Sequence, residues 1–135
     1  MICYCDGGSS GNPGTAAIGY VAYNDKDNNR LVATHGELVG QRTNNVAEYM
    51  AILKALCFMQ AQDSRGVIYS DSNIAIQQIN KEIECKDEKL IQMREAIYRT
   101  IKDYKMTVGF RYTARENNKK ADSIVNAILK EYRPN

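Results

Sequence analysis

The sequence predicts an α/β fold built on a five-stranded mixed sheet, in which three antiparallel strands are followed by two parallel ones, with helices on both faces. Up to residue 37, short apolar runs are separated by turn-forming residues, which is typical of strands joined directly. After residue 43, strand-like runs alternate with segments of helical spacing, which is typical of crossover connections between parallel strands. We expect residues 1–135 to form a single domain.

The first three strands are expected at residues 1–5, 16–23 and 30–37. Residues 25–29 are rich in Asp and Asn, which favours an antiparallel hairpin between the second and third strands. Asp6 ends the first strand, and residues 7–14 then contain four glycines. Because glycine lets a ligand lie against bare backbone N–H groups, we expect a loop that brings one carboxylate to the rim of the sheet and cradles a polar backbone. A plain turn with a solvated Asp is the alternative.

The later elements follow from capping residues and apolar spacing. A helix is expected to open at Thr43-Asn44-Asn45, with an Asn as its N-cap, and a buried strand is expected at residues 67–70. Asp71-Ser72 is expected to cap a short helix that ends near residue 79, and Asp87 or Glu88 starts the next helix. A strand at residues 106–112, a loop at 113–118 and an amphipathic helix at 119–131 complete the chain.

Composition and charge narrow the class of protein. No apolar run approaches the ~20 residues of a membrane span, and the N-terminus has no signal-peptide pattern, so we expect no membrane contact and a cytoplasmic location. The four cysteines lack zinc-binding spacing and are expected to be buried free thiols: Cys3, Cys5, Cys57 and Cys85. Residues 1–93 carry 8 Lys or Arg against 11 Asp or Glu, whereas residues 94–135 carry 10 against 5. This asymmetry fits a metal site beside a phosphate-binding surface.

Four acidic residues stand where the predicted elements begin or end: Asp6, Glu48, Asp71 and Asp122. If the first and fourth strands are parallel neighbours, Asp6 and Asp71 lie side by side, and both flanking helices can aim a carboxylate at them. Such like charges repel strongly unless a cation is bound. Oxygen ligands without His or Cys favour Mg²⁺, with Mn²⁺ as a substitute, and shared carboxylates suit two ions. The alternatives are that Glu48 only complements the helix dipole and that Asp71 is an N-cap.

Four motifs in order resemble the type 1 ribonuclease H family: Asp6-Gly7 with Gly11-Asn12-Pro13-Gly14, Thr43-Asn44-Asn45-x-Ala47-Glu48, Ser70-Asp71-Ser72, and Asn118-x-x-Ala121-Asp122. The resemblance extends over nearly the whole chain and implies a ribonuclease H-like fold. It also implies a two-metal endoribonuclease that cleaves the RNA strand of RNA–DNA hybrids, leaving 5′-phosphate and 3′-hydroxyl ends. Asp6 would bridge both ions, Glu48 and Asp71 would complete the ion at the leaving group, and Asp122 would help to hold the other.

The resemblance further implies a substrate-binding surface. Asn12, Asn44 and Asn45, with backbone groups of the glycine segment, would read ribose 2′-hydroxyls, which both donate and accept hydrogen bonds. Thr43 matches a residue that holds a phosphate of the DNA strand. The remaining members of the implied surface are Gly7, Ser9, Asn73, Arg115 and Lys119. As an alternative, Asn44 and Asn45 only cap their helix.

The sequence departs from many bacterial and animal relatives in two places. The segment from Ile79 to Leu90 is short and has no Trp, where those relatives carry a basic protrusion, and residues 112–118 contain no His. These departures resemble the compact archaeal and plant branch of the family. Lys119, Lys120, Arg111 and Arg115 are candidate phosphate contacts in compensation, and the single His35 is expected on a strand surface. We expect a monomer, with double-stranded RNA as a further candidate partner.

Two other functions are compatible with this fold. One is a module that binds hybrids or double-stranded RNA with little catalysis, which the presence of all four acids disfavours. The other is the nuclease domain of a reverse transcriptase or transposase, or a nuclease that acts on DNA junctions. Cleavage of a labelled hybrid compared with DNA duplex and double-stranded RNA distinguishes these alternatives.

Overall fold

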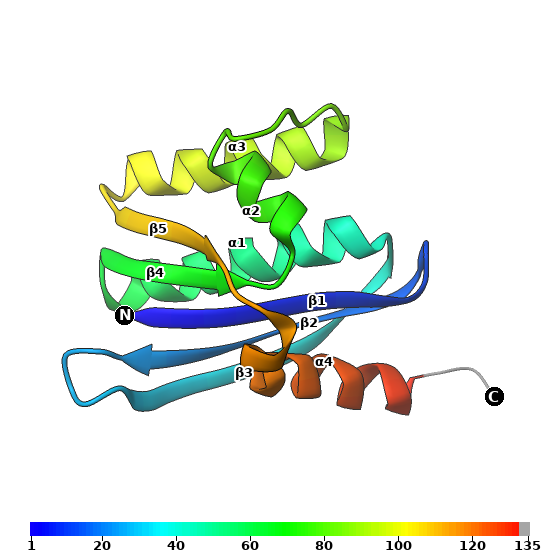
Figure 1. Ribbon diagram of the computed structural model, residues 1–135, viewed down its shortest axis with the longest axis horizontal. Coiled ribbons are helices and arrows are strands. Elements are labelled where there is room, and N and C mark those ends of the chain that lie inside the picture. The colour runs from blue at the N-terminus through cyan, green and yellow to red at the C-terminus, as the bar shows by residue number, and fades with distance from the viewer. Residues whose placement is uncertain (133–135) are drawn as a thin grey trace.

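The computed structural model describes residues 1–132, so the last three residues of the expected domain lie outside the described part. Its centre is a five-stranded mixed sheet in the order β3-β2-β1-β4-β5 (Figure 1). β1 pairs antiparallel with β2 and parallel with β4, β2 pairs antiparallel with β3, and β4 pairs parallel with β5. This is the predicted topology. The strands are β1 (Ile2–Gly11), β2 (Gly14–Asn24), β3 (Arg30–Arg42), β4 (Arg65–Ser70) and β5 (Thr107–Tyr112).

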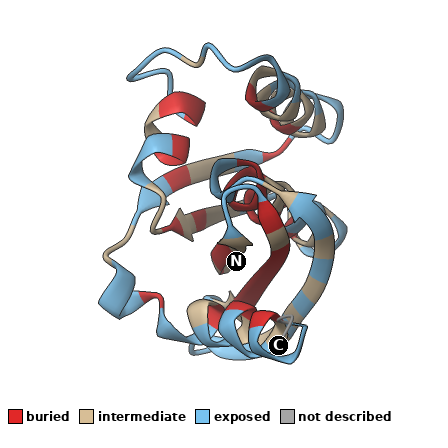
Figure 2. Cartoon of the chain, turned by 90° about the vertical axis from the view of Figure 1, so that its right-hand side faces the viewer, coloured by how far each residue is buried: buried red, intermediate tan, exposed pale blue. Residues whose placement is uncertain are grey.

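Helices cover both faces of the sheet, as predicted. α1 packs against β1 and β2 on one face and also against α3, whereas α4 packs against β1, β2 and β3 on the other face (Figure 1). Figure 2, in which buried residues are red, shows helices on either side of the sheet. The helices are α1 (Asn44–Gln62), α2 (Asn73–Ile79), α3 (Glu88–Asp103) and α4 (Lys119–Glu131), with a 3-10 turn η1 (Arg115–Asn117) just before α4. Among residues 1–132, no helix is both long and apolar enough to cross a bilayer.

The side of the sheet that faces α1 forms the main core. Cys3 and Cys5 of β1 are fully buried there, which confirms the prediction for these two thiols. Cys57 is exposed, so the prediction was wrong for it, and Cys85 is partly buried. The reason for Cys57 is geometric, because it lies about 100° around α1 from the buried Leu56 and so leaves the helix face that packs on the sheet.

The glycine-rich segment after Asp6 is a strand rather than the expected loop. β1 continues to Gly11 and pairs without interruption with β2, from Asp6 opposite Gly19 to Gly11 opposite Gly14. The low strand propensity of glycine suggested a loop, but cross-strand pairing in the hairpin overrides it. Asp6 therefore lies in the middle of a long strand, next to the point where the shorter neighbour β4 ends.

Helix capping also differs from the expectation at two positions. Thr43, not an Asn, is the N-cap of α1, where its hydroxyl accepts a hydrogen bond from the Val46 N–H at 3.2 Å. Ser72 alone caps α2 and accepts from the Ala75 N–H at 3.3 Å. Asp87 caps α3 as expected. Asp71, Asn44 and Asn45 are therefore not the N-caps of these helices, which excludes the alternative explanation that they serve only as caps.

Candidate active site

Three of the four predicted acids meet in one cluster. Asp6, Glu48 and Asp71 each offer a carboxylate oxygen, and these oxygens all lie within 4.8 Å of one another. The parallel pairing of β1 with β4 brings this about, because Cys5 lies opposite Ser70 and the acids that follow them are neighbours. The sequence predicted that Asp6 and Asp71 would lie side by side if the first and fourth strands were parallel neighbours, and β1 and β4 are.

Glu48 reaches the cluster because α1 lies very close to β1. The Gly7 N–H donates a 2.5 Å hydrogen bond to Glu48 Oε1. A Cβ atom at Gly7 would overlap the Ala47 carbonyl and come within 2.7 Å of the Glu48 nitrogen, so only glycine allows this approach. Glu48 lies one turn into α1, is 9% exposed, and is held by a backbone donor rather than by the helix dipole.

Asp122 lies in the same pocket, from the first turn of α4, but outside the trio of mutually close oxygens. Its Oδ1 is 3.5 Å from Nη2 of Arg115, and its Oδ2 accepts a hydrogen bond from Asn126 Nδ2 at 3.2 Å. The pocket has a volume of about 380 Å³. All four predicted acids therefore border one cavity, with Arg115 as a cation at its edge.

The electrostatics of the cluster favour a bound cation. Burial, followed by the charges of Asp71 and Asp122 and a hydrogen bond with Asp122, raises the pKa of Asp6 from 3.8 to about 8. Burial and the charges of Asp6 and Asp71 raise the pKa of Glu48 well above its ordinary value, although the Gly7 N–H partly opposes this. Such carboxyl groups retain protons unless a positive charge replaces them. An all-oxygen donor set of this kind suits a hard divalent cation.

Comparison with known proteins identifies the family. The family model for RNase H matches residues 1–130. The chain belongs to the RNase H family. It is 31% identical to Ribonuclease HI of Halobacterium salinarum over 93% of this chain and 62% of that protein. It is also 25% identical to the Bifunctional protein Rv2228c of Mycobacterium tuberculosis, of whose length it spans 35%.

Solved structures agree with this assignment. The crystal structure of RNase H1 from Halobacterium salinarum superimposes with a TM-score of 0.87 at 28% identity, covering 96% of this chain and 97% of that one. LC11-RNase H1, solved in complex with an RNA/DNA hybrid, gives a TM-score of 0.88 at 30% identity and covers 96% of both chains. RNase H enzymes need a divalent metal, and the acid cluster described above fits that requirement.

Some of the predicted substrate residues line the acid pocket, and others lie outside its lining. The Asn44 side chain lines the pocket, and its Oδ1 accepts a 2.9 Å hydrogen bond from the Ser9 N–H. Asn12 Oδ1 accepts from the Asn44 N–H at 3.1 Å and so ties the β1–β2 hairpin to the start of α1. Gly7, Ser9 and Arg115 also line the pocket, and Asn45 and Asn73 are exposed at the first turns of α1 and α2.

Lys119 is placed differently from the other predicted substrate residues. It borders a second cavity, on the other side of the junction between η1 and α4, and so does Lys120. The lone His35 lies in β3, where its Nε2 is 2.9 Å from Glu37 Oε1, far in the sequence from the acids and absent from the pocket lining. The expectation that His35 is a strand residue is confirmed.

Sequence reasoning missed the role of two asparagines in this site. Asn118 is 1% exposed, and its Nδ2 donates a 2.9 Å hydrogen bond to the Cys5 carbonyl, which fixes the start of α4 beside β1. Asn126 reaches Asp122 from one turn further along α4. The four-residue spacing of Asn126 from Asp122 could have indicated that contact, whereas the Asn118 contact joins residues 113 positions apart and has no local pattern.

Proposed function

We propose that this RNase H is a metal-dependent endoribonuclease that cleaves the RNA strand of RNA–DNA hybrids and leaves 5′-phosphate and 3′-hydroxyl ends. The observation that carries this proposal is the cluster of Asp6, Glu48 and Asp71, with oxygens within 4.8 Å of one another in a member of this family. The hybrid bound to LC11-RNase H1, at 30% identity, supports the choice of substrate.

The metal in this proposal is Mg²⁺, two ions in each site, with Mn²⁺ as a substitute. Asp6 would bridge both ions, Glu48 and Asp71 would hold one, and Asp122 would hold the other. When bound, such ions activate a water molecule and stabilise the leaving oxygen in phosphodiester cleavage. The protein contributes orientation, because Gly7 fixes the Glu48 carboxylate and Asn126 and Arg115 contact that of Asp122.

The asparagine contacts suggest how the RNA strand is recognised. The side-chain oxygens of Asn12 and Asn44 already accept hydrogen bonds from the Asn44 and Ser9 N–H groups. Their Nδ2 groups therefore remain as donors to a ribose 2′-hydroxyl, the group that distinguishes RNA from DNA. Asn45, Thr43 and Asn73 would extend this surface, and Arg115, which is 75% exposed, would contact a phosphate.

Cleavage of a labelled hybrid with Mg²⁺ tests the proposal. Asp6→Asn removes a ligand shared by both ions, and because metal charge stabilises the transition state by several kcal/mol, we expect a loss of about 10³-fold or more in the cleavage rate. Asp103→Asn changes an exposed Asp at the end of α3 and should cleave as the wild type does. An Asp6→Asn rate equal to the wild type would exclude this mechanism, and equal cleavage of a DNA duplex would exclude the substrate.

A further inference from the structure

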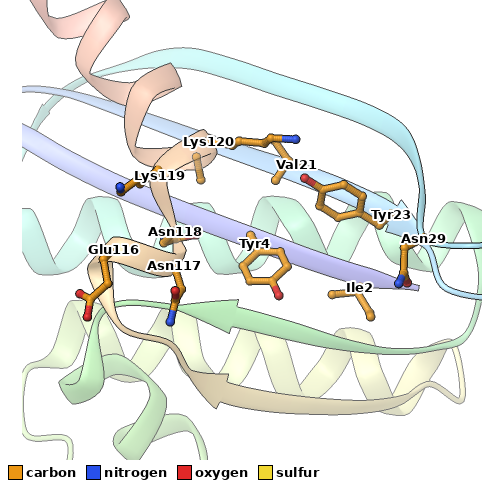
Figure 3. Close-up of a pocket in the computed structure, with 11 residues that line it drawn as sticks. Ile2, Tyr4, Val21, Tyr23, Asn29, Glu116, Asn117, Asn118, Lys119 and Lys120 are labelled. Carbon is orange, nitrogen blue, oxygen red and sulfur yellow. The ribbon is translucent and has the colours of Figure 1, made fainter.

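A second cavity lies on the same face of the sheet as the acid pocket. α4 covers only part of this face, where Gly19 and Gly36 allow Ile124 to pack directly onto the strands. Beyond the start of α4, toward the beginning of β1, the face opens into a cavity of about 410 Å³ (Figure 3). We call it the tyrosine-lined cavity; Ile2, Tyr4, Val21, Tyr23, Asn29, Glu116, Asn117, Asn118, Lys119, Lys120 and Ala121 line it.

Aromatic rings form the fixed part of this cavity. The ring of Tyr4 stacks on Tyr69 with a centroid distance of 4.9 Å and an interplanar angle of 12°, and it forms a T-shaped pair with Tyr23 at 6.1 Å and 86°. Tyr4 and Tyr23 border the cavity, whereas Tyr69 does not, so Tyr69 supports the Tyr4 ring from behind. Both rings are therefore held in place before any ligand arrives, which reduces the entropy lost on binding.

Two lysines, Lys119 and Lys120, border the tyrosine-lined cavity. Lys120 Nζ lies 5.6 Å from the centroid of the Tyr23 ring, and Figure 3 shows its side chain extending over β2 toward that ring. Within residues 1–132, neither Lys119 nor Lys120 forms a salt bridge, and Glu116 is the one acid in the lining. Both lysines also stand in the first turn of α4, where the helix dipole disfavours positive charge, so helix stability does not explain them. A bound anionic ligand would explain why two lysines stand at this position.

We propose that the tyrosine-lined cavity binds an unpaired nucleotide of single-stranded nucleic acid. Its base would stack against the tyrosines, and its phosphate would be held by Lys120 and Lys119. Aromatic rings on a sheet next to basic side chains are the combination that binds single strands, because every base has a stacking face. The volume of about 410 Å³ lies within the range of small-ligand sites, and the apolar floor of Ile2 and Val21 suits a flat ring.

The cavity lies close enough to the acid pocket for one nucleic acid to contact both. Tyr4 and Asp6 are two residues apart on β1 and therefore share a face, about 7 Å apart along the strand. On the neighbouring strand Tyr69 lies opposite Tyr4, and Asp71 follows directly after the end of β4. An unpaired end that leaves a bound duplex could thus reach the tyrosines. The proposal does not depend on cleavage, since the cavity shares no lining residue with the acid pocket.

Binding of a labelled single-stranded DNA oligonucleotide, followed by fluorescence anisotropy in EDTA, tests the site. Tyr23→Leu removes one stacking ring, and we expect the affinity to fall about 10-fold or more. Lys120→Gln should lower the affinity and reduce the slope of log K against log salt by about 0.7, the value for one phosphate contact on a single strand. Circular dichroism checks that Tyr23→Leu is folded, and the exposed Lys120 carries little folding risk.

Two matched variants act as controls. Tyr104→Leu changes a 56% exposed tyrosine at the end of α3, and Lys130→Gln changes a lysine in the last turn of α4; both should bind as the wild type does. Unchanged affinity in Tyr23→Leu or an unchanged salt slope in Lys120→Gln would overturn the proposal, as would equal losses in the controls. An absence of single-strand binding by the wild type, with an apolar peptide bound instead, would also overturn it.

Cleavage separates this proposal from the nuclease proposal. Tyr23→Leu should cut a blunt-ended hybrid at the wild-type rate, and Asp6→Asn should retain single-strand binding while losing cleavage. If Tyr23→Leu loses cleavage of the blunt hybrid in proportion to its loss of single-strand affinity, the cavity belongs to the hybrid site and is not a separate one.

Discussion

The acid pocket and the tyrosine-lined cavity lie on one face of one sheet, yet they are built from opposite chemistry. Asp6 follows Tyr4 by two residues on β1, and Asp71 follows Tyr69 by two residues, directly after the end of β4. In the pocket, burial and neighbouring carboxylates raise the pKa values of Asp6 and Glu48, whereas the Tyr4 ring of the cavity stacks favourably on Tyr69. Position along the strand, rather than the face, therefore decides what each region can bind.

The comparison also shows what separates the two regions. The junction of η1 and α4 crosses the sheet between them, and the buried Asn118 side chain fastens it to the Cys5 carbonyl. The acid pocket depends on this packing, because its own charges oppose its assembly unless a cation is bound. The cavity needs much less support, since stacked aromatic rings stabilise their own arrangement.

Among the variants that test this comparison, Gly7→Ala is expected to have the largest effect on stability. A Cβ atom there would overlap the backbone of α1, which cannot yield as a side chain can, so we expect the free energy of unfolding to fall by about 3 kcal/mol or more. Urea denaturation measures the loss. Cleavage should fall as well, because α1 carries Glu48, while single-strand affinity of the folded fraction should be unchanged.

Gly8→Ala is the matched control. A Cβ atom at Gly8 would have its nearest neighbour at 3.6 Å, an ordinary contact with the Val125 side chain. We expect a change in unfolding free energy of less than about 1 kcal/mol, because the added methyl group fits and restricts the unfolded chain. Equal stability losses in the two variants would show that the close approach of α1 at Gly7 is not what holds Glu48 in place.

The contrast between the two glycines marks how far the sequence could predict this site. The meeting of Asp6 and Asp71 could be predicted, because each follows one of two parallel runs that pair as neighbours, although Asp6 proved to lie within a longer strand. The strand through Gly7 and Gly8 could not, since glycine has low local strand preference and the pairing partner lies across the hairpin. Only the three-dimensional structure shows which glycine faces α1.

The tyrosine-lined cavity was equally hidden in the sequence. Tyr4 and Tyr69 are 65 positions apart and become neighbours only through the register of β1 with β4. Each residue alone reads as an ordinary strand aromatic, and Lys119 and Lys120 read as candidate contacts of the hybrid rather than of a second site. Helix and strand positions follow from local patterns, but the contents of a cavity depend on register and on where α4 begins.

A smaller effect is expected from Asn118→Ala, which weakens the boundary between the two regions. It removes a buried hydrogen bond and leaves the Cys5 carbonyl without that donor, so we expect a loss of about 2 kcal/mol in unfolding free energy. Because Asn118 borders the cavity and precedes the helix that carries Asp122, both cleavage and single-strand affinity should decrease. Asn73→Ala, at an exposed position, should leave the stability nearly unchanged; an equal loss there would contradict this role of Asn118.

The smallest effect, when it is expressed per pH unit, is the change of unfolding free energy with pH. This change distinguishes the two regions, because only the acid pocket contributes to it between pH 4 and 8. In the protein without metal, the pKa of Asp6 is about 8 in the native state against 3.8 in the unfolded chain. Between these values the native state holds more protons, so stability falls as pH rises from about 4 to 8, by at most about 1.4 kcal/mol per pH unit for one group. Tyr4 contributes nothing in this window, because its pKa is raised above its ordinary value of 10, chiefly by burial.

Urea denaturation in EDTA at pH 5 and pH 8 measures this slope. Asp6→Asn removes one titrating group and should reduce the slope, leaving the part that Glu48 contributes through its own raised pKa, whereas Asp103→Asn should keep the full slope. Mg²⁺ should stabilise the wild type more at pH 8 than at pH 5, because at pH 5 protons compete with the metal for the carboxylates. A slope in Asp6→Asn as steep as that of the wild type would exclude Asp6 as a titrating group, and its charge would then not control the stability of this face.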